Sequence, residues 1–345
     1  MRVLIIGGTR FTGPHTVRAL LTVGHDVAVF HRGRSESDLP AEAVHIHGDR
    51  SELPAHAERI RRFAPDVVLD MCAMTQSDAE MTLQIASGTA ERLVVASSAD
   101  VYRAYGVLIG QDAGPPDPVP IPEEAPLRSK LYPYRGAWAR DPDDPQLWKD
   151  HYDKILVERV VMGSQELAGT VLRLPMMYGP GDSQHRWYRY IKRMDDGRPA
   201  TLLGESESCW RTCVGYVENM AAAITRAVSD GRAAGRIYNV ADSESPPLGR
   251  WIRMIGAAAG WTGKVVPVPK EKLPEHLAFE VRPEQDLTLD TSRIKRELDF
   301  VELVPVEEAL RRTVAWEREH PPQEADPTAE QYAAEDAALT IASGR

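Results

Sequence analysis

A glycine-rich turn near the start of the chain has the residue types and spacing to hold a diphosphate. Residues 7–13 read GGTRFTG and stand between a short apolar run and a segment with helical spacing. Glycine allows a tight turn and close backbone approach to a pyrophosphate, while the following helix N-terminus offers unpaired N–H groups and a positive dipole. This context favours dinucleotide binding over a purely structural turn. The expected contacts are Gly7, Thr9, Arg10, Phe11 and Gly13.

The end of the second apolar run carries basic residues where an acidic one would hold a ribose 2′-hydroxyl. The sequence there is FHRGR, which places His31 and Arg32 at that point. A guanidinium pairs well with a 2′-phosphate, so NADP is favoured over NAD. The alternative is that Arg32 and Arg34 form a solvated charge run. Asp49 accepts a hydrogen bond from an adenine amino group or serves only as a turn residue.

These residues need a framework of alternating strands and helices. Apolar runs predict buried parallel strands at residues 2–6, 25–30, 66–71, 92–97, 170–174 and 236–240. Helical spacing predicts helices at residues 14–21, 57–63, 78–87, 147–162, 217–228, 249–259 and 306–319. The alternation predicts an α/β fold built on a doubly wound parallel sheet with right-handed crossovers.

Composition narrows the classes of function. The chain has 345 residues, is 43% hydrophobic and 27% charged, and carries a net charge of -10, which excludes wholesale disorder and disfavours nucleic-acid binding. The cysteines are Cys72, Cys209 and Cys213 without a CxxC pair, which fits a reducing, cytoplasmic setting. His185 with Cys209 and Cys213 matches no known zinc spacing, so we expect no metal. We expect no membrane span, since no stretch reaches the required length.

Two segments interrupt the alternation. Residues 111–145 are rich in proline and charge, which predicts a long loop or insertion of the kind that often forms a lid. From about residue 321 the chain is acidic and alanine-rich, and the sequence leaves open a docked helix or a frayed tail.

Several motifs, taken in order, resemble a known superfamily. They are GGTRFTG, GDR at 48–50, SSADVY at 97–102, DKILVE at 153–158, RLPMMYGPGD at 173–182, RTCVGYVEN at 211–219, YNV at 238–240 and DTSRIKREL followed by EEALRRTVAW. Their order and spacing resemble the extended short-chain dehydrogenase/reductase superfamily, most closely its NAD-dependent epimerase/dehydratase branch. The resemblance covers roughly residues 1–320. The GGTRF form also resembles a subgroup that includes plastid stem-loop RNA-binding proteins.

The resemblance implies a nucleotide-binding Rossmann domain and a smaller C-terminal α/β substrate domain. We place the first at 1–174, with an insertion at 103–146 and completion by 212–242, the second at 175–211 and 243–320, and a tail at 321–345. The resemblance also implies a homodimer.

The implied activity is an epimerase, dehydratase or reductase that transfers hydride with NAD(P), acting on a sugar nucleotide or a related polar substrate. One alternative is a catalytically altered dinucleotide-binding regulator or RNA-binding protein, although the acidic balance opposes RNA. Another keeps the catalysis but gives it an unusual acid/base residue.

The family's catalytic residues carry over in part. The family uses a serine or threonine, a tyrosine that acts as acid/base, and a lysine that lowers the tyrosine pKa and binds the nicotinamide ribose. Ser98 and Lys154 match the first and last of these. Asp100 stands where dehydratases of the family carry a glutamate, which hints at a second acid/base group, although it could equally cap a turn.

The tyrosine position departs from the family pattern. Four residues before the lysine stands Asp150, and the nearest tyrosine, Tyr152, is only two before it. On a regular helix that is about 200° away from the required direction, so Tyr152 reaches the site only if the helix starts irregularly. Asp150 and His151 are alternative bases, and the insertion offers Tyr132 or Tyr134.

The same resemblance suggests contacts outside the catalytic group. Further cofactor contacts are expected from Arg50, Ala73, Lys154 and Pro175, and substrate contacts from Tyr102, Met176, Arg186, Trp210 and Arg211. Arg211 matches an arginine that binds substrate diphosphate, with a structural salt bridge as the alternative. Trp210 stacks on a ring or fills the core.

Overall fold

The computed structural model describes residues 1–35, 39–136, 140–141, 143–144, 146–279, 281–323 and 326–342. Its centre is a seven-stranded sheet in the order β10-β6-β5-β4-β1-β2-β3, in which all neighbours are parallel. The strands are β1 (Arg2–Ile6), β2 (Asp26–His31), β3 (Val44–His47), β4 (Val67–Asp70), β5 (Arg92–Ser98), β6 (Ala168–Leu174) and β10 (Arg236–Asn239). The predicted doubly wound parallel sheet is confirmed.

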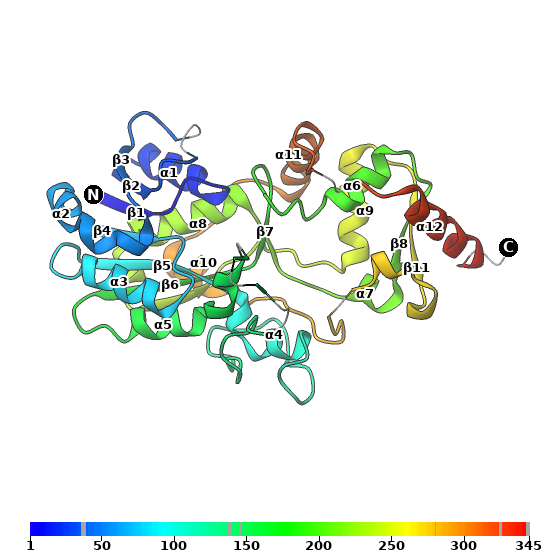
Figure 1. Cartoon of the computed structure of the whole chain (residues 1–345), viewed down its shortest axis with the longest axis horizontal. Helices are drawn as coiled ribbons and strands as arrows, with labels where there is room; N and C mark the ends of the chain where they lie inside the picture. The colour runs from blue at the N-terminus through cyan, green and yellow to red at the C-terminus, as the bar shows by residue number, and fades with distance from the viewer. Residues whose placement is uncertain are drawn as a thin grey trace.

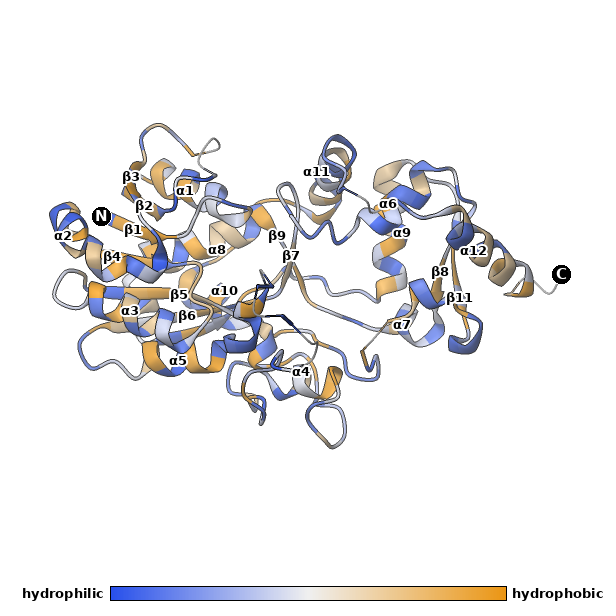
Figure 2. Ribbon diagram, viewed as in Figure 1, coloured by the Kyte–Doolittle hydropathy of each residue, from blue (hydrophilic) through white to orange (hydrophobic). Residues whose placement is uncertain are grey.

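Helices cover both faces of this sheet, as Figure 1 shows. One face packs against α1 (Thr12–Thr22), α8 (Val217–Ser229) and α10 (Ser292–Leu298), and the other against α2 (Ala57–Phe63), α3 (Gln76–Ala86) and α5 (Lys154–Met162). Because both faces are covered, the strands read as continuous apolar runs, and they are mostly orange in Figure 2.

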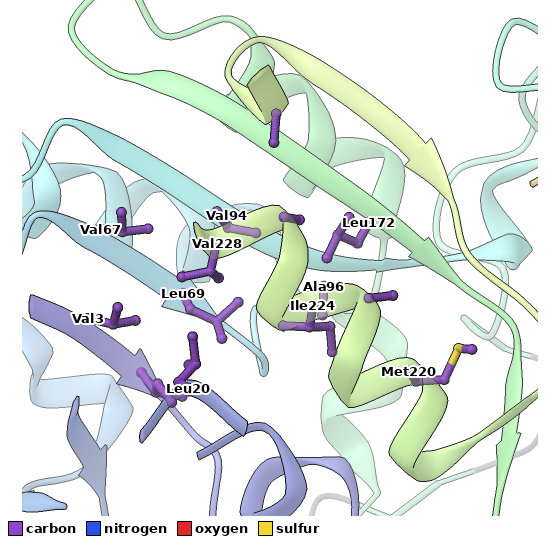
Figure 3. Packing of buried hydrophobic residues seen from close by; sticks show 14 of the residues in the cluster. Val3, Leu20, Val67, Leu69, Val94, Ala96, Leu172, Met220, Ile224 and Val228 are labelled. Atoms are coloured by element: carbon purple, nitrogen blue, oxygen red, sulfur yellow. The ribbon is translucent and has the colours of Figure 1, made fainter. Parts of the chain in front are cut away.

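Helix α8 illustrates how this core is held. Its Met220, Ile224 and Val228 lie at helical spacing and face the sheet residues Leu69 and Val94 in Figure 3. All five side chains are fully buried. Burial of each large apolar side chain contributes roughly 1.5–3 kcal/mol, so this face holds α8 firmly against the sheet.

A smaller lobe lies beyond the sheet, on the right of Figure 1. It contains α6 (Tyr188–Asp195), β8 (Ala200–Gly204), α7 (Glu205–Cys209), α9 (Leu248–Ala259), β11 (Lys264–Val268), α11 (Val306–Glu319) and α12 (Ala329–Ala342). Strands β7 (Met176–Tyr178) and β9 (Val214–Tyr216) pair in parallel between the sheet and this lobe. Strands β8 and β11 form a second parallel pair.

The end of the chain is a docked helix, which answers a question that the sequence left open. The carboxylate of Glu335 in α12 is buried and accepts from Arg193 at 2.6 Å and from His276 at 3.0 Å. Ala338 packs in an apolar cluster with Leu202. A buried ion pair with this geometry holds the helix against the smaller lobe.

Two predictions of local structure need refinement, and the long loop expected at 111–145 is confirmed among the described residues. The expected helix at 147–162 is broken into a 3-10 segment at Leu147–His151 and α5 from Lys154. The insertion expected at 103–146 begins with α4 (Arg103–Leu108), and the residues described within 111–145 contain no helix or strand. Helix α10 falls within the range expected for the substrate domain, yet its Ile294 and Leu298 pack into the core of the large sheet.

Across the described ranges, the structure has no helix with both the length and the apolar character needed to cross a bilayer.

Candidate active site

The glycine turn is built so tightly that a side chain would not fit. Gly7 and Gly8 have φ of 93° and 83°, values that favour glycine. A Cβ on Gly13, near the start of α1, would lie 2.3 Å from the backbone carbon of Gly8. The segment after β7 closes the other side, since a Cβ on Gly181 would lie 3.5 Å from Phe11 Cα. The turn and the helix N-terminus therefore form a cradle that fits a dinucleotide diphosphate.

The basic segment at the end of β2 has one buried side chain and two exposed ones. Arg32 and Arg34 are exposed, whereas His31 is buried and bonded to neighbours. Asp49 accepts hydrogen bonds from the backbone and hydroxyl of Ser51, which hold its pKa below the usual range, with a smaller contribution from the two arginines. The two guanidiniums are close enough to act on Asp49 and open enough to meet a phosphate.

The Arg50 head group is committed to the interior of the fold. It donates to Asp70 at 2.7 and 2.8 Å, to Asp78 at 2.8 Å, to Thr82 at 3.0 Å and to Cys72 at 3.3 Å. Asp70 is fully buried at the end of β4, so Arg50 compensates its charge. Arg50 is expected to contact the cofactor, but its guanidinium already donates within the network that fixes β4 to α3.

Four candidate catalytic residues meet at the carboxyl ends of β4 and β5. The Tyr152 hydroxyl donates to Asp100 Oδ2 at 2.7 Å, and the nearby Ser98 side chain acts to lower the pKa of the phenol. Lys154 Nζ donates to the carbonyls of Ala73 and Ala96 at 2.6 and 2.8 Å and lies 6.0 Å from the Tyr152 ring centroid. Serine, tyrosine and lysine are thus brought together although their spacing departs from the family pattern.

Burial governs the electrostatics of this cluster. Desolvation raises the pKa of the Asp100 carboxyl and raises that of the Tyr152 phenol well above its usual value, with the Asp100 charge adding to the second effect. Desolvation lowers the pKa of Lys154, partly opposed by Asp70 and Asp100. The other carboxylate oxygen, Asp100 Oδ1, is buried and finds no hydrogen-bond partner in the part of the chain described. Such an acceptor is ready for a proton or a ligand hydroxyl.

The irregular start of α5 is what directs Tyr152 into the cluster. The 3-10 turn ends at His151, Tyr152 is extended with φ -65° and ψ 126°, and α5 begins at Lys154. Asp153 caps the helix by accepting from the Ile155 backbone at 2.9 Å and pairs with Arg128 at 3.2 Å, with both of these charged side chains fully buried. Since the chain is extended rather than helical at Tyr152, the angular argument against it from a regular helix does not apply.

The insertion folds over the cluster and adds a second tyrosine. Tyr134 donates to Asp100 Oδ2 at 3.3 Å, and its hydroxyl lies 2.9 Å from that of Tyr105. The Tyr132 backbone donates to Asp153 at 2.6 Å, while its ring stacks under Arg135. Tyr134 is therefore next to the cluster through its side chain, and Tyr132 through its backbone.

The two alternative bases lie elsewhere. Asp150 accepts from Arg140 through its side chain and from Arg135 through its backbone carbonyl. His151 is exposed at the end of the 3-10 turn. The described contacts of Asp150 include none with Ser98 or Tyr152, so the structure does not bring these residues together.

The expected substrate contacts divide into core and surface. Tyr102 is fully buried, with its hydroxyl 2.6 Å from Asn239 and 2.9 Å from Arg173, so its ring has no surface for a substrate. Trp210 is buried and donates to the Gln285 carbonyl at 2.9 Å, which fulfils the core alternative. Arg211 is exposed and donates to the Ser245 carbonyl.

A hollow of about 340 Å³ lies in the segment that follows Gly181. It is lined by Ser183, Gln184, His185, Arg186, Tyr188, Arg189 and Pro322. Arg186 is held there by Asp182 at 2.7 Å. The lining combines basic groups suited to an anion, but it does not include the Ser98–Tyr152 cluster. Pro175 is buried and Met176 is half-buried just before this segment. Met176 packs against the apolar cluster of the smaller lobe, as does Phe11 of the glycine turn.

Two features were missed from the sequence. Asp153 was not singled out, because a helix cap paired to a distant arginine gives no local pattern. The group His31, His45 and His47 was also missed, although the alternation in HIH at 45–47 places both of its histidines on one strand face.

The fold and the cradle define a nucleotide-binding α/β enzyme class, and comparison with known proteins gives the family. The model of the NAD dependent epimerase/dehydratase family matches residues 3–119 and 149–241, and the gap between the two ranges covers most of the insertion. The chain belongs to this family and is an enzyme of the epimerase, dehydratase or reductase type.

Relatives support the assignment over most of the chain. A 2'-dehydrokanamycin reductase of Streptomyces kanamyceticus is 27% identical over 290 residues, which are 80% of this chain and 72% of that protein. A UDP-N-acetyl-alpha-D-glucosaminuronate decarboxylase of Bacillus cytotoxicus is 24% identical over 343 residues, 92% of this chain and 98% of that protein. The Bordetella bronchiseptica enzyme WbmG in complex with NAD and UDP shares the fold, with TM-score 0.67 and 18% identity over 92% of this chain and 94% of that one.

Proposed function

We propose that this protein oxidises or reduces a carbinol carbon of a sugar nucleotide or related polyol with NAD(P), and that Tyr152 is its acid/base residue. The observation that carries the proposal is the contact of the Tyr152 hydroxyl with Asp100 at 2.7 Å, beside Ser98 and Lys154. The relative that acts on a UDP-sugar and the neighbour that holds UDP support the substrate class.

The cradle fits the cofactor, because the close packing of Gly13 on the Gly8 backbone leaves no side chain between the turn and the N-terminus of α1. The turn at Gly7 and the N-terminus of α1 would hold the diphosphate, and Lys154, with one N–H beyond its two carbonyl bonds, would hold the nicotinamide ribose. When bound, the nicotinamide exchanges a hydride with the substrate carbon.

The chain's own residues handle the proton. In the oxidation direction, the substrate hydroxyl gives its proton to the Tyr152 oxygen while the Tyr152 proton passes to Asp100 Oδ2, along the existing hydrogen bond. The phenol then never has to exist as a phenolate, which its raised pKa would oppose. Ser98 orients the phenol, and the Lys154 charge favours the ionised form of Asp100.

We propose NADP as the preferred form of the cofactor. The exposed Arg32 and Arg34 stand at the end of β2, where a 2′-phosphate would lie, and Arg10 is exposed across the glycine turn with its guanidinium bonded to Ser35. Titration with NADPH and NADH tests this. Tighter NADPH binding that is lost in Arg32→Ala supports the proposal, whereas tighter NADH binding contradicts it.

The function is tested by incubating the purified protein with UDP-glucose, UDP-N-acetylglucosamine and UDP-glucuronate, each with NAD and with NADP. Nicotinamide absorbance reports net redox, and NMR of the sugar reports epimerisation or loss of water. We expect turnover of at least one of these sugar nucleotides and its loss in Tyr152→Phe. Cofactor binding without turnover of any of them would contradict the substrate class, and absence of cofactor binding would contradict the whole proposal.

A further inference from the structure

Three imidazoles lie together on one face of β2 and β3, the last two strands at one edge of the large sheet. His31 ends β2, and His45 and His47 alternate along β3. The strand register pairs His31 with His47, and the two-residue period brings His45 to the same face. The ring centroids are 5.0 Å apart for His31 and His45, 4.9 Å for His31 and His47, and 5.9 Å for His45 and His47.

We propose that His31, His45 and His47 form a binding site for a divalent transition-metal ion of the zinc class. One ring nitrogen from each residue lies within 4.8 Å of those of the other two. Three nitrogens at about 2.0–2.1 Å from a tetrahedral zinc ion would be roughly 3.4 Å apart, so the separations between the ring nitrogens need to change by at most about 1.4 Å. Imidazole suits zinc, copper and nickel better than magnesium or calcium, and water would complete the coordination.

Two of the existing hydrogen bonds of His31 bear directly on metal uptake. The Gly33 backbone N–H donates to His31 Nδ1 at 3.1 Å, so in neutral His31 the proton lies on Nε2, which is 2.8 Å from His45 Nδ1. An ion bound to His31 Nε2 takes the place of that proton, which moves to Nδ1 as the hydrogen bond from Gly33 is given up. Gly33 stands between Arg32 and Arg34, so the ion also adjusts the segment proposed to meet the cofactor.

The position of the site gives the ion a structural role. Strand β3 has four residues, lies at the edge of the sheet and, among the described strands, pairs only with β2. Short edge strands are easily frayed, and an ion shared by the two strands would tie β3 to the sheet. His31 is buried, His45 is half-buried and His47 is exposed, so the cluster is open to solvent on one side and an ion can enter.

The experiment uses the full chain without a histidine tag, treated with a chelator and then dialysed. Zinc is titrated calorimetrically, bound metal is measured by elemental analysis, and cobalt is used as a probe because its visible spectrum reports coordination geometry. The variants are His45→Gln and His47→Gln, with His320→Gln at the C-cap of α11 as the matched control outside the cluster. Circular dichroism and thermal melting verify that each variant folds, and His47→Gln alters an exposed residue.

We expect one equivalent of zinc per chain in the wild type and in His320→Gln, with a cobalt spectrum typical of a four-coordinate site. Affinity should fall at least about tenfold in His45→Gln and His47→Gln, and the rise in melting temperature caused by zinc should disappear. Less than one equivalent in the wild type, or equal affinity in His47→Gln and His320→Gln, would overturn the proposal. Cofactor binding is measured separately on the same protein, so failure here leaves the proposed function standing.

Discussion

Two segments lead into helices at the carboxyl edge of the same sheet, and they differ in what determines their shape. The glycine turn before α1 is set by contacts among its own residues, since Gly13 packs against the backbone of Gly8. The segment from Leu147 to Lys154 is set by distant residues, since Tyr152 contacts Asp100 and Asp153 pairs with Arg128. Local geometry can be inferred from spacing, whereas the second segment required the tertiary structure.

The comparison also bears on the proposed role of Tyr152, which stands two residues before Lys154 and not four. A regular helix would require a tyrosine four residues before Lys154 to reach the site. An extended residue immediately before a helix cap offers another route, because the side chain no longer follows the helical period. The helix is interrupted at Tyr152 and Asp153, so the position of Tyr152 does not follow from helical spacing. It is held instead by the buried ion pair of Asp153 with Arg128.

The largest effect is expected from Asp153→Ala, which removes what holds the second segment. Arg128 would be left buried without its carboxylate partner, and α5 would lose its cap. We expect a loss of about 3–5 kcal/mol in the free energy of unfolding, measured by urea denaturation. A loss below about 1 kcal/mol would mean that local sequence, and not the Arg128 pair, shapes this segment.

The next effect tests the first segment. In Gly13→Ala the new methyl group would lie 2.3 Å from Gly8, so the turn must open. We expect a loss of about 3 kcal/mol in stability and of cofactor binding, measured by thermal melting and calorimetry. Gly231→Ala is the control, because no atom lies within 4 Å of its added methyl group. Equal behaviour of the two variants would refute the tight cradle.

Asp100→Asn removes the proposed proton acceptor and leaves the other residues of the cluster in place. Burial raises the Asp100 pKa, and the carboxylate must be ionised to accept the proton, so the rate of oxidation should rise as pH increases through that raised pKa. In Asp100→Asn we expect about a 10²-fold lower rate and loss of this rise in the pH–rate profile. An unchanged profile would exclude Asp100 as the titrating group.

The smallest effect is expected from Asp150→Asn. Asp150 pairs with the buried side chain of Arg140 outside the cluster, and an amide can still accept a hydrogen bond from it, so the replacement should lower stability by about 1–3 kcal/mol and leave kcat within a factor of two. Steady-state kinetics and thermal melting measure both quantities. A large fall in kcat with normal stability would restore Asp150 as a base.

The framework could be predicted because it follows local patterns. Buried runs such as residues 2–6 and 92–97 became β1 and β5, and the expected helices at 57–63 and 306–319 have the bounds of α2 and α11. The docking of α12 could not be predicted, since it depends on Glu335 meeting Arg193 across 142 residues of sequence.

Within the site, residue type could be predicted better than residue role. Ser98 and Lys154 lie in the cluster, but Tyr102 and Trp210 are buried in the core, because an aromatic motif does not show which side of a chain faces a cavity. The Arg50 network and the histidine group depend on side chains from separate strands and helices, which no single spacing reveals.

The most direct measurement is the single-turnover rate of hydride transfer to bound nicotinamide, followed by absorbance, for the wild type, Tyr152→Phe and Asp150→Asn. Removal of the Tyr152 hydroxyl should slow this step by about 10²–10⁴-fold while cofactor affinity is kept, and Asp150→Asn should match the wild type. A normal rate in Tyr152→Phe together with a slow rate in Asp150→Asn would contradict the assignment of Tyr152 as the acid/base residue.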